Sequence, residues 1–172
     1  MAFDPLEIHH TFARYNAWMN EKLLASCSTL SDEARKQPLS IPFGSLHGVW
    51  NHLMVGDHLW LGRFENSKLP FEFLGLEMEL YSDWDELRGA RVALDEHIGR
   101  FAESLTIERL DSDLHWISAT NPTPRISPFV TTLAHFWNHQ THHRGQITAT
   151  MELLGLDCGV TDLLALPGVI AR

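Results

Sequence analysis

The sequence is poor in positive charge and in cysteine. It has 13 Lys and Arg residues against 22 Asp and Glu, a formal net charge of −9, and no run of Lys or Arg. Such a chain repels a phosphate backbone on average, so we expect no nucleic-acid partner. Cys27 and Cys158 are isolated and show no CxxC or framework spacing, which suits a reducing cytoplasm. We expect both to be buried small residues.

Segments that would direct the chain to a membrane are also missing. The N-terminal stretch 1–7 has neither a basic nor an apolar leader region. No apolar run approaches the roughly 20 residues that a membrane-spanning helix needs. The G-x-S-x-G, P-loop and dinucleotide-binding glycine patterns are absent as well. We therefore expect a cytoplasmic protein without membrane contact, and we disfavour serine hydrolases and nucleotide-binding enzymes.

The composition and length of the chain predict one globular domain that spans 1–172. A hydrophobic content of 44% with 20% charged residues is typical of a soluble protein, and 172 residues are enough to bury a real core. We find no internal repeat and no shift in composition that would mark a second domain.

Apolar residues at helical spacing predict an all-α protein, a four-helix bundle with helices over about 4–27, 45–64, 82–105 and 127–154. Asp4 is the expected cap of the first helix, and Ser45 that of the second. Ser82 with Asp85 resembles a capping box for the third, and Gly155 lies just past the fourth. The apolar positions of the third helix are Trp84, Leu87, Val92, Leu94, Ile98 and Phe101.

The connections between these helices differ in character. The loop 65–81 is long for a bundle, and we expect it to pack over the domain. The stretch 114–128 is compatible with a small hairpin or an irregular loop. A short C-terminal tail with leucines at 163, 164 and 166 is expected to fold back onto the bundle. Gly48 and Gly56 cost helix propensity in the second helix, which indicates close helix packing there.

Histidines are concentrated in the fourth predicted helix. His135, His139, His142 and His143 fall within nine residues, and side chains three or four apart on a helix are close enough to share a metal. The pairs 135/139, 139/143 and 139/142 are all possible, and spacing does not choose among them. His52 on the second helix could supply a third ligand. Three imidazoles would leave coordination positions free on a divalent ion such as zinc, nickel or iron, which is typical of a reactive site.

The histidine spacing also invites comparison with the zinc-peptidase helix H-E-x-x-H, and the comparison fails. Gln140 stands where the peptidase has its glutamate, and an amide cannot act as that general base. The sequence therefore argues against a metallopeptidase.

Three segments together resemble the DinB/YfiT-like family over nearly the full length of the chain. They are Tyr15-Asn16-Ala17-Trp18-Met19-Asn20 in the first helix, Asn51-His52-Leu53 followed by Asp57, Trp60, Leu61 and Arg63 in the second, and the run from His139 to Gln146 in the fourth. The resemblance implies a four-helix bundle, usually a homodimer. It also implies a divalent metal held by His52, His139 and His143.

Members of this family include transferases that use low-molecular-weight thiols such as bacillithiol, mycothiol or glutathione, and a thiol-dependent isomerase. The resemblance thus implies a metal-dependent enzyme that takes a small-molecule thiol and an electrophile. The alternative is a non-catalytic stress-response protein that binds a metal or a small ligand. Asp57 and Gln140 are candidates for orienting the imidazoles, and Arg144 for pairing with a carboxylate of the thiol or substrate.

Overall fold

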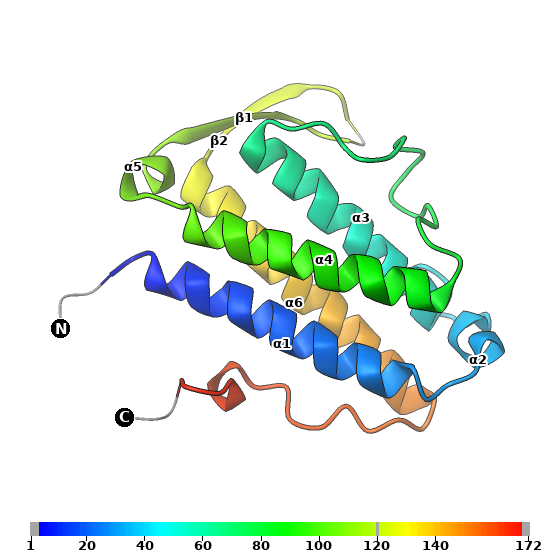
Figure 1. Ribbon diagram of the computed structural model, residues 1–172. Coiled ribbons are helices and arrows are strands. Elements are labelled where there is room, and N and C mark those ends of the chain that lie inside the picture. The colour runs from blue at the N-terminus through cyan, green and yellow to red at the C-terminus, as the bar shows by residue number, and fades with distance from the viewer. Residues whose placement is uncertain (1–3, 120, 170–172) are drawn as a thin grey trace.

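Four long helices pack side by side in the computed structural model, which describes residues 4–119 and 121–169 (Figure 1). The predicted domain span 1–172 and the N-terminal stretch 1–7 extend beyond the described residues. The long helices are α1 (Glu7–Cys27), α3 (Leu46–Glu65), α4 (Trp84–Glu103) and α6 (Phe129–Leu153). Both α1 and α3 contact α4 and α6, so the four surround one core. The predicted all-α four-helix bundle is confirmed.

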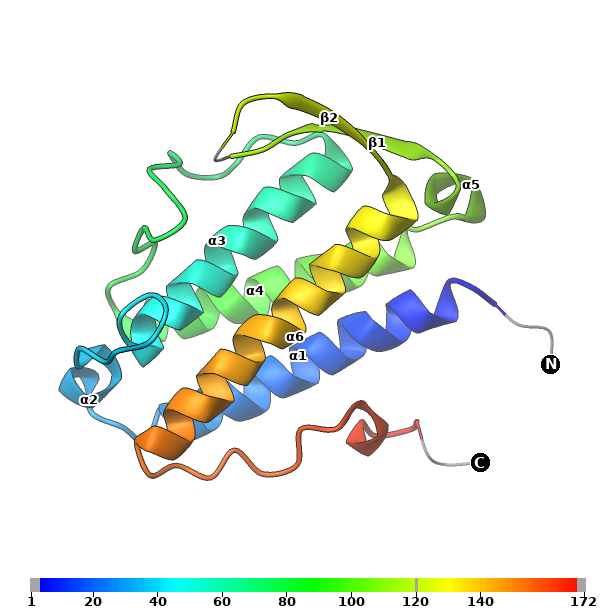
Figure 2. The ribbon, with the colours of Figure 1, turned by 180° about the vertical axis from the view of Figure 1, so that it is seen from behind.

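The direction of the helices explains the longest loop. Figures 1 and 2 show that α1 and α6 run in one direction along the bundle, whereas α3 and α4 run in the other. Because α3 and α4 are parallel, the chain must return over the whole length of the bundle between them. The segment 66–83 makes this return, and it passes over the domain as expected.

Short elements fill the remaining connections. The segment 113–128 forms a two-stranded antiparallel hairpin in which Asp113 pairs with Pro128 and Ile117 with Pro124. The hairpin contacts α3 and α6. Of the two alternatives for this segment, the structure therefore shows the hairpin. The short elements are α2 (Asp32–Lys36), α5 (Ile107–Leu110), β1 (Asp113–Ile117), β2 (Pro124–Pro128) and the 3-10 helix η1 (Leu163–Ala165).

The helix starts agree only partly with the expected caps. Ser45 caps α3, and its side chain accepts a hydrogen bond from the backbone N–H of the third helical residue at 3.0 Å. Asp4 does not cap α1, because its carboxylate accepts from the N–H of Leu6 in a turn that precedes the helix. The cap of α4 is Asp83 and not Ser82, since the Asp83 carboxylate accepts from two N–H groups of the first turn. At α4 the adjacent Asp83 takes the place of Ser82, whereas α1 begins without a side-chain cap.

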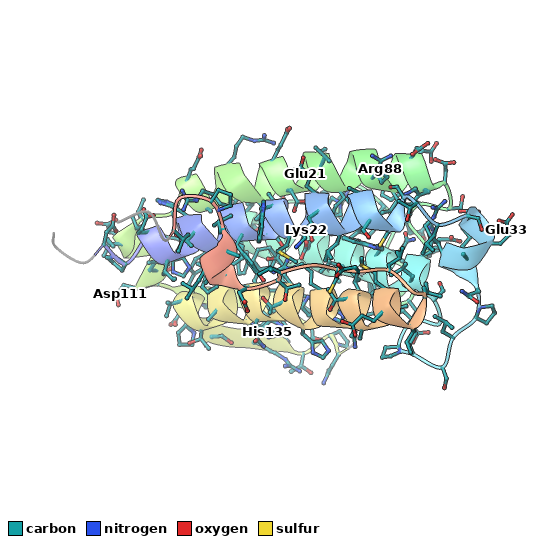
Figure 3. All side chains as sticks on the ribbon, turned by 90° about the horizontal axis from the view of Figure 1, so that it is seen from below. Glu21, Lys22, Glu33, Arg88, Asp111 and His135 are labelled. Atoms are coloured by element: carbon teal, nitrogen blue, oxygen red, sulfur yellow. The ribbon has the colours of Figure 1, made fainter. Side chains whose placement is uncertain are left out.

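The C-terminal tail lies along α1 and α6, as expected. The Tyr15 hydroxyl donates to the carbonyl of Thr161, and Leu166 is buried in the core. Figure 3 shows Lys22 of α1 beside this segment. Cys27 is fully buried, but Cys158 in the tail is only partly buried, so the expectation for Cys158 was wrong. None of the described helices has both the length and the apolar character needed to cross a membrane.

One residue of α4 that was expected in the core is exposed, and the residue before it is buried instead. Val92 is 51% exposed, whereas its neighbour Arg91 is completely buried. One terminal guanidinium nitrogen of Arg91 donates to Asp57 on α3, and the other terminal nitrogen donates to Asp95, each at 2.7 Å. Two oppositely charged partners compensate for removing this cation from water.

The other two long helices join the same buried network. From α1, the Asn20 amide donates to Asp95 at 3.0 Å. From α6, the Gln140 amide donates to Asp57 at 3.2 Å. Hydrogen bonds that start from one guanidinium thus connect all four long helices.

We predict that Arg91→Met lowers the free energy of unfolding by about 3–5 kcal/mol, because it leaves two buried carboxylates without their cation. Urea denaturation followed by circular dichroism measures this change. The matched control is Arg100→Met on the same helix, where an exposed arginine lies 3.9 Å from Glu96. The control should cost less than about 1 kcal/mol. Equal losses in the two variants would contradict a special role for the buried network.

Candidate metal centre

Three histidines from two helices converge on one point. The Nε2 atom of His143 lies 3.1 Å from Nε2 of His52 and 3.0 Å from Nε2 of His139. The three rings offer ligand atoms that all lie within 4.8 Å of one another. Of the pairs that spacing allowed on the fourth helix, the structure thus brings 139/143 together with His52. His142 is exposed and hydrogen-bonds to Gln146 instead.

Neighbouring acceptors fix the orientation of two of the rings. Nδ1 of His52 lies 2.8 Å from the carbonyl oxygen of Leu76, and Nδ1 of His143 lies 2.8 Å from Oε1 of Gln146. Carbonyl oxygens only accept hydrogen bonds, so these partners assign the ring proton to Nδ1 in both histidines. Each Nε2 lone pair then points into the cluster. Phe43 also stacks on His52, with ring centroids 3.7 Å apart.

The donor set fits a divalent metal ion. Imidazole nitrogens about 2.0–2.1 Å from a tetrahedral zinc would stand about 3.3 Å apart, close to the two short nitrogen distances of the cluster. Neutral rings that direct lone pairs at each other repel, and a shared cation removes that repulsion. Nδ1 of His139 is buried and has no partner among the described residues, so packing alone orients this ring.

Burial keeps the three imidazoles neutral. Burial and, to a smaller extent, the adjacent imidazoles lower the pKa of His139 to about 3. Burial lowers the pKa of His143 to about 4, although the hydrogen bond with Gln146 opposes this shift. Burial also lowers the pKa of His52. The rings are therefore unprotonated near pH 7, which is the form that binds metals.

Two glycines of α3 give the cluster the space that it needs. A Cβ atom on Gly56 would lie 2.6 Å from Cε1 of His139, so any larger residue would displace that ring. A Cβ atom on Gly48 would lie 2.1 Å from the carbonyl oxygen of Phe43. Close helix packing is therefore found at Gly56, whereas Gly48 lies against the loop backbone at Phe43, the residue that stacks on His52.

Asp57 and Gln140 lie beside the cluster but not on it. They hydrogen-bond to each other, and Asp57 also accepts from Arg91. Complete burial raises the pKa of Asp57, and the Arg91 guanidinium opposes this shift. In the described part of the chain, neither side chain hydrogen-bonds to the three imidazoles, whose outer partners are Leu76 and Gln146.

Arg144 faces α1. It is 4% exposed, donates to the Asn16 amide oxygen and to the Thr141 hydroxyl, and lies 5.2 Å from the Tyr15 ring. Burial lowers its pKa to about 10, so it remains a cation near neutral pH. This position joins Arg144 to the buried network and leaves little of it accessible to a substrate.

Sequence reasoning missed three groups that shape the cluster. Gln146 had a readable signal, because it follows His143 by three residues on the same helix and can reach its ring. Phe43 and Leu76 come from irregular segments, where no periodicity indicates which backbone or ring will meet His52.

The chain belongs to the DinB family, whose family model matches residues 3–169. It is 27% identical over 155 residues to Protein DinB of Bacillus subtilis (strain 168), a match that covers 86% of this chain and 87% of that protein. The fold is similar to the crystal structure of a DinB-like protein from Bacillus cereus ATCC 10987. That comparison has a TM-score of 0.58 and 20% identity, and it covers 83% of this chain and 90% of the other.

We predict that Gly56→Ala weakens zinc binding about tenfold or more, because the added methyl group displaces the His139 ring. Competition with a chromophoric chelator measures the affinity. The matched control is Gly89→Ala on α4, where a Cβ atom meets nothing within 4 Å. The control should bind zinc like the wild type and gain up to about 1 kcal/mol of stability. Wild-type affinity in Gly56→Ala would contradict the assigned contact.

We also predict that the metal is released only at a lower pH than is usual for histidine ligands. Protons compete with the metal only when the pH approaches the pKa values of the folded protein, which are about 3 for His139 and about 4 for His143. Because the pKa of His52 is lowered as well, zinc affinity should begin to fall at a lower pH than it would with ordinary histidines, which would lose zinc from about pH 6.5. Titration at several pH values, with circular dichroism to verify folding, distinguishes these two courses.

Proposed function

We propose that this protein is a metal-dependent thiol S-transferase or a related thiol-dependent enzyme whose divalent metal is held by His52, His139 and His143. The observation that carries the proposal is the convergence of these three neutral imidazoles. Three protein ligands leave coordination positions for a small molecule, as in catalytic metal sites. Zinc or nickel suits imidazole ligands best, and iron is the alternative.

A divalent metal bound there would lower the pKa of a coordinated thiol and provide a thiolate near neutral pH. The chain itself contributes the orientation of the ligands, through Leu76 and Gln146, and a covered face of His52, through Phe43. Burial raises the pKa of the Cys27 thiol to about 11, which argues against a protein nucleophile at that residue. On this proposal the nucleophile comes with the substrate.

Support for a thiol as the partner comes from the DinB family, whose members include transferases that use bacillithiol, mycothiol or glutathione. On this proposal the partners are a small-molecule thiol and an electrophile. We further propose a homodimer in the cytoplasm, without a nucleic-acid or membrane partner.

A second candidate is a non-catalytic stress-response protein that binds a metal or a small ligand. One observation favours it. Among the described residues, no carboxylate hydrogen-bonds to the three imidazoles, and Asp57 is fully buried against Arg91. Among these residues, then, no carboxylate is held against the rings in the position of a general base.

We predict about one metal ion per chain in untagged wild-type protein and its loss in the folded variants His52→Ala and His139→Ala. The physical reason is that two imidazoles hold a divalent ion far less tightly than three. Plasma mass spectrometry measures the metal content. His142→Ala is the matched control and should keep its metal, because His142 is exposed and lies outside the group of three ligands. Metal-free wild type that also takes up no added zinc, nickel or iron would overturn the proposal.

The absorption spectrum of cobalt-loaded protein distinguishes the proposed thiol-dependent enzyme from the non-catalytic binding protein. If the metal takes a thiol as ligand, glutathione should produce a sulfur-to-cobalt charge-transfer band in the wild type, and S-methylglutathione should produce none. Unchanged spectra with glutathione and with other low-molecular-weight thiols would favour the non-catalytic module.

A further inference from the structure

A second group of cationic and aromatic side chains lies between α3 and the hairpin. The Arg63 guanidinium is 4.5 Å from the ring centroid of Trp60 and 5.0 Å from that of Trp116 on β1. The guanidinium of Arg125 on β2 is 5.1 Å from the same Trp116 ring. Two helical and two hairpin residues thus form one cation–π cluster.

The N–H groups of the Arg63 guanidinium have no hydrogen-bond acceptor among the described residues. Among the described residues, no carboxylate pairs with it and no oxygen accepts a hydrogen bond from it, although its side chain is half-buried. Burial lowers the pKa of Arg63, but the group remains a cation near neutral pH. Stacking on indole rings occupies the face of a guanidinium and leaves its N–H edge free. That edge matches the two oxygens of a planar oxyanion.

Arg63 lines a pocket of about 470 Å³, which falls in the range of small-molecule sites. Its lining includes Leu59, Arg63, Asn66, Phe73, Trp116 and Ile117. Arg63 carries the one formal charge among the described lining residues, and none of them is acidic. The chain has 22 acidic and 13 basic residues, so a pocket with one unpaired cation and no described acidic lining residue favours a ligand of the opposite charge.

The pocket is separate from the three histidines. Arg63 follows Gly56, which contacts His139, by seven residues along α3, a distance of about 10 Å. His135, labelled in Figure 3, lies between them, with its ring 4.9 Å from Trp60 and 5.9 Å from His139. None of the three clustered histidines lines the pocket.

We propose that this pocket binds a small molecule with an aromatic or apolar body and one carboxylate, which accepts two hydrogen bonds from the edge of Arg63. The single guanidinium matches a single negative charge, and Trp116 with Phe73 provides surfaces for the body of the ligand. The inference requires no metal and does not depend on the reaction proposed for the histidine cluster.

Titration of the full chain with 3-phenylpropionate in the presence of EDTA tests this site apart from any metal. Saturable binding should shift the indole N–H signals of Trp60 and Trp116 in ¹H–¹⁵N spectra. The neutral 3-phenylpropionamide should bind about tenfold more weakly or worse, because it cannot form the charge-assisted pair. Arg63→Gln should weaken binding of the acid by a similar factor. Arg63→Lys, which keeps the charge and loses the fork, should fall between Arg63→Gln and the wild type.

The matched control is Arg14→Gln, which removes an exposed charge from α1 and should leave the affinity unchanged. Circular dichroism verifies that each variant is folded. Lack of saturable binding by the acid, equal binding of acid and amide, or wild-type affinity in folded Arg63→Gln would overturn the proposal. Tighter binding of phenyl phosphate than of the carboxylate would overturn the assignment of ligand class.

Discussion

One buried guanidinium, shared by two carboxylates, sets the arrangement of the four helices. Arg91 is completely buried and bonds to Asp57 and Asp95, while Asn20 and Gln140 attach α1 and α6 to the same carboxylates. Charges removed from water are tolerated only while each keeps its partners. An apolar core would accept several helix registers, whereas this network loses hydrogen bonds in any other. We infer that it favours specificity of packing more than stability.

The histidine cluster depends on that arrangement. Asp57 lies five residues after His52 on α3, and Gln140 directly follows His139 on α6. Their hydrogen bond therefore joins the two helices beside the place where His139 rests on Gly56. A shift of one helix along the other would separate His52 from His139 and His143. The site thus obtains its geometry from rigid helices and from a network that never touches the imidazoles, which is how precise sites are usually supported.

Much of this architecture was predictable, and the errors have physical causes. Helix positions followed from apolar spacing and from Ser45, and the convergence of the three histidines followed from histidine spacing together with the family resemblance. Apolar spacing alone does not identify Arg91 as a core residue and points to Val92 instead, which is exposed. The spacing 84, 87, 91, 94, 98 continues smoothly through residue 91, and Asp95 follows one turn later. A charged residue in a core position, with an opposite charge four residues on, was therefore a readable signal.

The same features constrain the chemistry at the cluster. Gln140 replaces the glutamate that a zinc peptidase would use, and its amide is directed to Asp57. The carboxylates of Asp57 and Asp95 are paired with Arg91, and burial keeps the three imidazoles neutral. A reaction that needs a protein base to activate water is poorly served by such a site. A reaction whose nucleophile ionises on the metal and whose proton leaves to solvent needs only oriented neutral ligands. This difference is the physical reason for preferring thiol transfer to hydrolysis.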